Sequence, residues 1–510
     1  MVWNDRHPEE PLVRFDGGNM DCGNGLLLLI RRHIDPLDPG GLLEILSTEP
    51  TVEVDLPAWS RLTGNELVSA VRTGEQRSYL IRKKNAAPRP TGEPAVRVSP
   101  VNPAPANPAA SNPAASNPLP SPAKLPPFSV MGIGSWPRPE WLLRALRDKL
   151  SGRLSEAEFD ATADDAVRLA VAAQERAGVD VVTDGEQRRD NYSSFVGGRL
   201  DNCQLIPVTD LLPYVDDPAH FAEELKALDV PAEQVRHPAV FGRISRSRPI
   251  AVHELRALQG ITKKPTKVAL PGPYLLTRTM WLECVSDKAY PDRETLAQDI
   301  VKVLREEIAE LLASGAAIVQ LDEPVLTEVV FTRVQAGRSF MCGALGAKRE
   351  TGDELAFAGQ LIRSVLEGFP RERMALHICR GNWSRDESVA LTGPYTPLVP
   401  LLQTLPVGTY FLELATPRAG ELDPLKELPR EARIGVGSVN QKLDRVETVA
   451  DIVARAEQAV RLFGPDRVFL NPDCGFATFA DNPVASALVA EQKLAAMSQA
   501  ALLLRTRFFS

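Results

Sequence analysis

Short apolar runs alternate with longer amphipathic stretches over most of the chain after residue 128. Eight runs have the length of buried strands: residues 129–133, 180–183, 267–270, 317–321, 374–377, 410–414, 433–436 and 467–470. Helical stretches separate most of them, as at 156–177, 295–314 and 353–367. Repeated strand and helix units predict an α/β fold with a parallel sheet, and eight of them predict a closed (β/α)8 TIM barrel.

The first part of the chain has a different pattern. It predicts strands at 12–15, 42–46, 66–72 and 77–83, with helices at 25–34 and 51–63. This order predicts a small α+β two-layer sandwich, with helices on one face of a sheet.

Residues 88–127 consist of Pro, Ala, Asn and Ser repeats with almost no bulky apolar side chains. Such a segment buries too little surface to fold, and its prolines extend it. It predicts a linker between a first domain, residues 1–87, and a second domain, residues 128–510.

Composition and charge limit the classes of function that the protein can have. The net charge of -8 and the pI near 5.5 provide no basic surface for nucleic acid or an anionic membrane. No apolar run reaches the length of a transmembrane helix, and the first residues lack the pattern of a signal peptide. We therefore expect a cytoplasmic protein with a small-molecule substrate and six reduced cysteines, of which Cys203, Cys284 and Cys342 are structural.

Each apolar run of the second domain ends in polar or reactive residues, such as DGEQRRD, DEP, HICRGN and NPDCGF. In a barrel the carboxyl ends of all strands share one face, so these segments are expected to converge there. The stretch 204–264 is too long for an ordinary connection, and we expect a subdomain or a hairpin over the mouth of the barrel.

Four of these residues form a candidate zinc set. His377 and Cys379 lie two apart at one strand end and so share a face. Glu413 and Cys474 follow two further runs. Zinc prefers such a mixture of nitrogen, sulfur and oxygen ligands, and it keeps a coordinated thiol deprotonated. The alternative is a zinc ion with four protein ligands that only stabilises the fold.

The motifs HICRGN and NPDCGF resemble the catalytic C-terminal barrel of cobalamin-independent methionine synthase, and the resemblance covers about residues 128–510. It implies that zinc is held by His377, Cys379, Glu413 and Cys474. It also implies that Glu186 and Asp322 bind the amino group of homocysteine. The segment Ile133-Gly134-Ser135 would meet the carboxylate of homocysteine. Helix capping is the alternative for both acidic residues.

Two departures from that family concern the methyl donor. The sequence lacks the additional barrel that helps to bind folate, as do short, single-barrel relatives. The catalytic His of the family aligns with Asn440, which cannot act as a general acid at neutral pH. We therefore expect a methylcorrinoid, presented by a partner protein, to serve better than methyltetrahydrofolate. Asp473 is the candidate proton donor if folate is used.

Residues 1–87 resemble the small sulfur-carrier (TusA-like) family in MDCGNGLLLLIRRHIDPLDPGGLLEIL and the closing YLIRKK. The resemblance implies that Cys22, at the start of a helix where a thiolate is stabilised, carries persulfide sulfur. The family's Cys-Pro-x-Pro is Cys22-Gly-Asn-Gly here, so a docking or regulatory module is the alternative.

Together these features predict a zinc-dependent methyltransferase that acts on a thiol, with homocysteine as the expected acceptor. The alternatives are another zinc-thiolate alkyl transfer, of the coenzyme M type, and a sulfur-relay scaffold that uses Cys22. The related uroporphyrinogen decarboxylase barrel would be a third class, but it lacks this zinc set.

Overall fold

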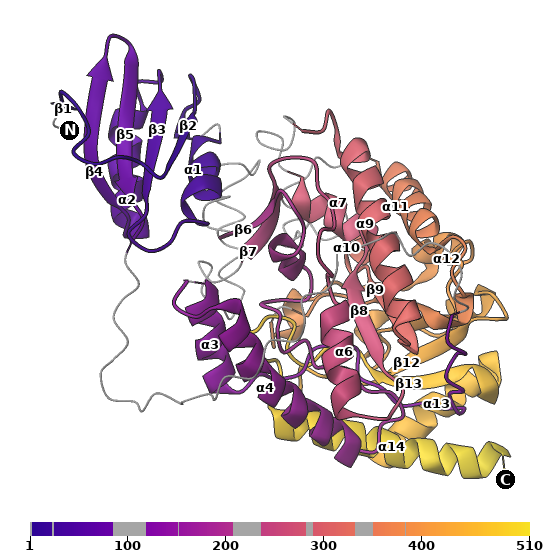
Figure 1. Cartoon of the computed structure of the whole chain (residues 1–510). Coiled ribbons are helices and arrows are strands. Elements are labelled where there is room, and N and C mark those ends of the chain that lie inside the picture. Colours follow the sequence, from indigo (N-terminus) through magenta and orange to yellow (C-terminus); the bar gives the residue numbers. More distant parts are fainter. Residues whose placement is uncertain are drawn as a thin grey trace.

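The computed structural model describes residues 3–22, 25–84, 119–150, 152–207, 236–281, 289–331, 350–382 and 384–509. Figure 1 shows the N-terminal part in indigo beside a larger body that contains the rest of the chain. Most of the predicted linker lies outside the described residues, as do Cys284 and Cys342.

The N-terminal part contains one mixed sheet in the order β1-β4-β5-β3-β2 and two helices. Its elements are β1 (Trp3–Asn4), β2 (Val13–Asp16), α1 (Leu26–Ile34), β3 (Leu42–Ser47), α2 (Val52–Thr63), β4 (Glu66–Thr73) and β5 (Gln76–Arg82). Alternate strand residues, among them Leu43, Ile45 and Ile81, form one core with Leu26 and Leu56 of the helices. This packing agrees with the predicted two-layer arrangement.

The larger body is built on six parallel strands in the order β13-β12-β11-β10-β9-β8. They are β8 (Lys267–Pro271), β9 (Ile318–Asp322), β10 (Met374–Ile378), β11 (Thr409–Leu412), β12 (Arg433–Val439) and β13 (Val468–Pro472). The prediction of strands in these six runs is confirmed.

The first two predicted runs form single parallel bridges instead of full strands. Val130 pairs with Leu470, Met131 with Val181, and Val182 with Thr266. The Asp180 carboxylate, and not a backbone carbonyl, accepts the N–H of Val130 at 2.8 Å, so this backbone bond of the ladder is not made. These bridges connect β13 to β8 in a circle, which is consistent with the expected barrel.

Helices cover the outside of this ring (Figure 1). They are α3 (Glu140–Leu150), α4 (Glu156–Arg176), α6 (Val252–Ile261), α7 (Pro273–Met280), α9 (Arg293–Ala313), α10 (Val325–Phe331), α11 (Thr351–Leu366), α12 (Val399–Leu402), α13 (Val449–Phe463) and α14 (Ala487–Phe509). A smaller apolar cluster that includes Ile318, Ala375, Phe411 and Phe469 fills the inside of the ring. Among the described helices, none combines the length and the apolar character needed to cross a membrane.

The long insertion after the second run contains an antiparallel hairpin, β6 (Cys203–Pro207) and β7 (Arg236–Val240), as predicted. This hairpin contacts α1 of the N-terminal part. Arg32 donates to the carbonyl of Phe241 at 3.0 Å, and Gln204 donates to the carbonyl of Arg31 at 3.1 Å. The hairpin therefore connects the two parts of the chain.

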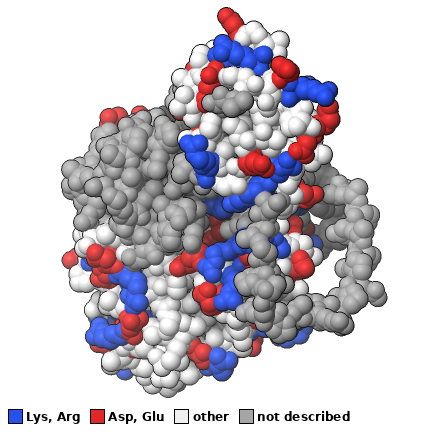
Figure 2. Space-filling model, turned by 90° about the vertical axis from the view of Figure 1, so that its left-hand side faces the viewer, with Lys and Arg blue, Asp and Glu red and all other residues white. Residues whose placement is uncertain are grey.

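The surface carries charges of both signs. Figure 2 shows acidic and basic side chains interspersed where the N-terminal part meets the larger body. Two of the described arginines near the hairpin, Arg199 and Arg248, share the carboxylate of Glu156.

Candidate active site

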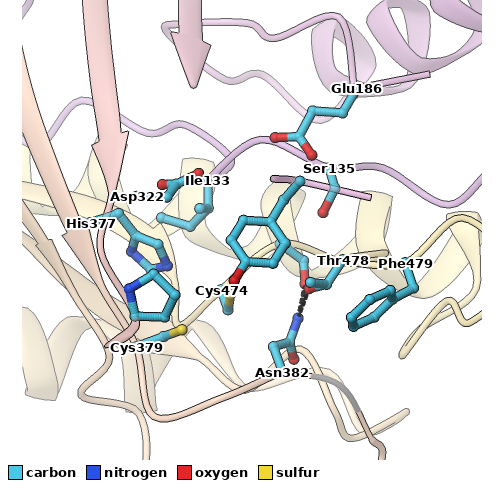
Figure 3. Close-up of a pocket in the computed structure, with 13 residues that line it drawn as sticks. Ile133, Ser135, Glu186, Asp322, His377, Cys379, Asn382, Cys474, Thr478 and Phe479 are labelled. Carbon is cyan, nitrogen blue, oxygen red and sulfur yellow. Dashed lines mark hydrogen bonds between the residues drawn. The ribbon is translucent and has the colours of Figure 1, made fainter. Parts of the chain in front are cut away.

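Three predicted ligands meet at the carboxyl ends of two strands. His377 lies in β10, Cys379 follows that strand directly, and Cys474 lies two residues beyond β13. One ligand atom from each lies within 4.8 Å of the others, and all three residues are buried (Figure 3). This spacing is suited to a single metal ion between them.

The ring of His377 is oriented for metal binding. Its Nδ1 lies 3.1 Å from the carbonyl oxygen of Phe411, which can only accept a hydrogen bond. The proton is therefore on Nδ1, and Nε2 carries a lone pair. Nε2 is buried and has no hydrogen-bond partner among the described residues. A backbone partner that fixes the tautomer of a histidine is usual at metal sites.

The two sulfurs interact closely without a metal. Cys474 donates a hydrogen bond to Cys379, and this bond holds the pKa of Cys379 well below its usual value, with help from His377. The same bond raises the pKa of Cys474. One thiolate is therefore already stabilised where a cation would bind, so the residues present fit a zinc ion.

Glu413 follows β11 directly but does not join the cluster. One carboxylate oxygen accepts the N–H of Arg380 at 2.7 Å, and the other pairs with Arg418 at 2.5 Å. The fourth predicted ligand thus lies at the expected strand end, but its charge is neutralised by an arginine.

The cluster opens into a pocket that also contains most of the predicted substrate-binding residues (Figure 3). The lining residues are Ile133, Ser135, Glu186, Tyr192, Asp322, Pro324, His377, Cys379, Asn382, Cys474, Gly475, Thr478 and Phe479. Residues separated by more than 300 positions in the sequence therefore share one cavity, as the barrel topology predicts.

Glu186 and Asp322 face this pocket as buried carboxylates. Burial raises the pKa of Glu186 to about 7, Arg189 opposes this effect, and Asp322 adds to it. Burial also raises the pKa of Asp322. The Oε2 atom of Glu186 has no hydrogen-bond partner among the described residues. Two buried carboxylates, of which Glu186 has an oxygen without a partner among the described residues, favour a cationic ligand group.

Backbone geometry holds Glu186 in place. Its φ of 54° is in the left-handed region, which non-glycine residues seldom adopt outside functional sites. A Cβ on Gly134 would lie 2.1 Å from Oε1 of Glu186, so a side chain at this position would displace the Glu186 carboxylate. Ser135 accepts the N–H of Ala477 at 3.3 Å, which connects the predicted carboxylate-binding segment to the loop that bears Cys474.

Comparison with known proteins agrees with this geometry. The family model "Cobalamin-independent synthase, Catalytic domain" matches residues 128–215, 219–352 and 375–501. The chain belongs to this family. A methionine synthase from Sulfurisphaera tokodaii is 26% identical over 353 residues, which cover 69% of this chain and 87% of the relative.

Two further relatives differ in length. A 5-methyltetrahydropteroyltriglutamate–homocysteine methyltransferase from Acidithiobacillus ferrooxidans is 25% identical over 70% of this chain, but the match spans only 39% of that protein. A solved B12-independent methionine synthase from Shewanella sp. W3-18-1, in complex with selenomethionine, has a TM-score of 0.56 and 24% identity. It covers 75% of this chain and 99% of its own, and it supports the fold.

Two predicted catalytic residues of this synthase-family chain do not line the pocket. Asp473 accepts the backbone N–H groups of Leu414 and Ala415, each at 2.8 Å, and so shapes the loop after Glu413. The side-chain amide of Asn440 donates to Glu387. Asn440 was inferred from its alignment with the family's catalytic His, and Asp473 was considered as an alternative proton donor beside Cys474. Neither inference fixes where the side chain points.

Sequence reasoning did not single out Asn382 and Lys442. Asn382 donates to the carbonyl of Gly475 and to Thr478, each at 2.7 Å, and thereby connects the two cysteine-bearing loops (Figure 3). Its place in HICRGN could have suggested this. The Nζ of Lys442 is buried with no hydrogen-bond partner among the described residues, and burial lowers the pKa of Lys442. No pattern around Lys442 indicated its burial.

Cys22 differs from the thiolate expected at a helix start. The α1 helix begins at Leu26 with Gly25 as its N-cap, so Cys22 lies outside the first turn. The cysteine is buried, and burial raises its pKa to about 12, with a further contribution from Asp55 and Asp21. The expectation of a stabilised thiolate is wrong, because Cys22 precedes the helix and is buried near two carboxylates.

This environment makes Cys22 a poor nucleophile. Because only the thiolate reacts, we expect the folded chain to accept sulfane sulfur on Cys22 at least about tenfold more slowly than an exposed cysteine of ordinary pKa. Mass spectrometry after incubation with a persulfide donor measures this, with Cys22→Ser as the control for the site of modification. Rapid, stoichiometric addition of one sulfur atom to Cys22 would support the carrier role instead.

Proposed function

We propose that this protein transfers a methyl group to the sulfur of homocysteine and forms methionine, with zinc held by His377, Cys379, Cys474 and Glu413. One observation carries the proposal: the buried His-Cys-Cys cluster opens into the same pocket as two buried carboxylates and Ser135. An amino-acid thiol has a thiol, an ammonium and a carboxylate, and the pocket provides a counterpart for each. The names of the relatives agree with this substrate.

Zinc, when bound, supplies the positive charge that keeps a substrate thiol deprotonated near neutral pH. His377 is ready to bind it because its Nδ1–H is already occupied by the Phe411 carbonyl. Cys379 and Cys474 provide sulfur ligands on the pocket wall. Glu413, whose carboxylate contacts Arg418, would be the fourth ligand.

The remaining pocket residues orient the substrate. Glu186 and Asp322 would accept the ammonium group, and the segment from Ile133 to Ser135 would meet the carboxylate. Coenzyme M carries a negative sulfonate and no ammonium, so two buried carboxylates disfavour it. The pocket therefore favours an amino thiol among the possible acceptors.

The two possible methyl donors differ in what their leaving groups require. The nitrogen of methyltetrahydrofolate must gain a proton, whereas a methyl group on cobalt leaves without one. Asn440 cannot supply that proton, and neither Asp473 nor Lys442 lines the pocket. We therefore propose a methylcorrinoid as the donor, presented by a partner protein.

The test combines homocysteine with either methylcobalamin or methyltetrahydrofolate and measures methionine. We expect turnover with methylcobalamin to be about 100-fold faster than turnover with methyltetrahydrofolate. A general acid typically contributes about this factor, and the reaction with methyltetrahydrofolate would lack one here. Robust turnover with methyltetrahydrofolate would contradict the choice of donor. In that case, Lys442→Met would show whether the Lys442 ammonium supplies the proton. No methionine with either donor would contradict the proposed function itself.

For residues 1–87 we propose a sulfur-carrier-like domain that now serves for docking. Its α1 helix contacts the hairpin of the larger body through Arg32 and Arg31. The buried Cys22 supports docking over sulfur transfer. The metal site in the larger body and the unreactive Cys22 thiol in the N-terminal part are compatible with methyl transfer as the only activity.

A further inference from the structure

Lys267 lies on the inner face of the ring, beneath the pocket. It is the first residue of β8 and is only 1% exposed. Its Nζ lies 2.6 Å from Oε1 of Gln320 and 4.3 Å from the centre of the Phe411 ring. Among the described residues no carboxylate lies within salt-bridge distance of this ammonium. A lysine is rarely buried in this way without a carboxylate partner, so its contacts call for a functional explanation.

The lysine reaches the pocket through one intermediate. Gln320 lies on β9 two residues before Asp322, so both side chains face the inside of the ring. The Nε2 of Gln320 donates to Oδ1 of Asp322 at 2.6 Å. The chain of contacts runs from Lys267 through Gln320 to a carboxylate that lines the pocket.

The direction of these hydrogen bonds is fixed at the lysine end. The ammonium group can only donate, so the amide oxygen of Gln320 has to face Lys267. The NH2 group of Gln320 then has to face Asp322, where it donates to one oxygen. Without the lysine, the amide oxygen of Gln320 loses its donor, and the side chain is held at one end only. Lys267 thus anchors the side chain that donates to Asp322.

We propose that Lys267 is a positioning residue for the amino group of the substrate: through Gln320 it holds Asp322 in the orientation that accepts the ammonium of an amino thiol. This inference rests on the proposed function, because it takes homocysteine as the acceptor.

The surrounding charges explain why a cation is needed at this place. Glu186 and Asp322 repel each other across the pocket. Arg189 lies 3.8 Å from Glu186, but it is paired mainly with Glu254 at 2.6 Å. Among the described residues Asp322 has no arginine partner; burial raises its pKa, and Lys267 is one of the groups that oppose this effect. Burial lowers the pKa of Lys267 to about 7, and the charges of Asp322 and Glu186 oppose this effect.

The variant Lys267→Met tests the inference, because methionine keeps most of the volume and removes the charge. We expect homocysteine to bind about tenfold more weakly, which is the effect of losing one charge-assisted hydrogen bond. 4-Mercaptobutanoate has the same thiol and carboxylate but no amino group. Its binding should change by less than about twofold, since no ammonium meets Asp322. Binding is measured by calorimetry on zinc-loaded protein, and zinc content is measured for each variant.

Two further variants make the test specific. Gln320→Met should weaken homocysteine binding by the same factor, and Lys267→Met combined with Gln320→Met should weaken it no further, because both changes break one chain of contacts. Gln320→Met also carries the test if Lys267→Met does not fold. Lys263→Met, an exposed residue just before β8, is the matched control and should leave binding unchanged.

Three results would overturn the inference. One is an equal loss for both thiols in Lys267→Met, which would indicate a structural role only. Another is unchanged binding of both. The third is a loss in the double variant that equals the two single losses combined. If the wild-type protein binds 4-mercaptobutanoate and homocysteine equally well, the ammonium site of the proposed function fails as well. That result is distinguishable because it is seen before any substitution is made.

Discussion

Replacing Cys474 by Ser or His377 by Ala should remove the zinc and abolish methyl transfer. Both residues contribute a buried ligand atom to the cluster. Loss of a residue that merely supports a ligand costs about 10-fold to 100-fold in affinity or activity. Loss of a ligand itself should therefore cost more than about 100-fold in zinc affinity. Metal analysis after dialysis against a weak chelator measures this directly.

Cys203→Ser is the matched control for the thiol variants. Cys203 is a free, half-buried cysteine on β6, outside the pocket, and its loss should leave one zinc per chain. Retention of a full equivalent of zinc by Cys474→Ser would show that the cluster is not the metal site. A freshly purified, reduced wild-type sample without zinc would have the same consequence.

The second large effect is expected for Glu186→Gln, which keeps the shape of the side chain and removes its charge. A hydrogen bond between a carboxylate and an ammonium group contributes about 1.5–3 kcal/mol, so homocysteine should bind about 10-fold to 100-fold more weakly. Zinc should be retained, because Glu186 does not belong to the ligand cluster. Calorimetry and metal analysis on the same sample separate the two effects.

The pH dependence of binding provides a second readout for Glu186. Its pKa is raised to about 7, so the carboxylate is charged above that pH and protonated below it. Since the substrate amine is cationic throughout this range, wild-type binding should weaken as the pH falls through 7. In Glu186→Gln, the weakening of homocysteine binding as the pH falls through about 7 should disappear. Unchanged homocysteine binding at pH 8 in the variant would indicate that Glu186 only caps a helix.

The sequence predicted the fold well where apolar runs are long and uninterrupted. Six of the eight runs are strands whose ends lie within three residues of the prediction, because a fully buried parallel strand has to be apolar on both faces. The runs at 129–133 and 180–183 form only single bridges. There the side chain of Asp180 takes the place of a backbone acceptor, which hydrophobicity alone cannot indicate.

The site was predictable to the extent that topology determines it. Strand ends converge, so Cys474 meets His377 and Cys379 although almost 100 residues separate them. Side-chain partners were not predictable. Glu413 pairs with Arg418 only five residues later, and Cys22 is buried beside two carboxylates. Such contacts depend on packing, which a local sequence pattern does not encode.

The zinc dependence of methionine formation tests the central claim most directly. The full chain is prepared with one equivalent of zinc and, separately, after removal of zinc by a chelator, and each sample receives homocysteine and methylcobalamin. The account predicts methionine from the zinc-loaded protein, a loss of more than about 100-fold in the stripped protein, and recovery when zinc is restored. Methionine formed at the same rate by the stripped protein would contradict the account.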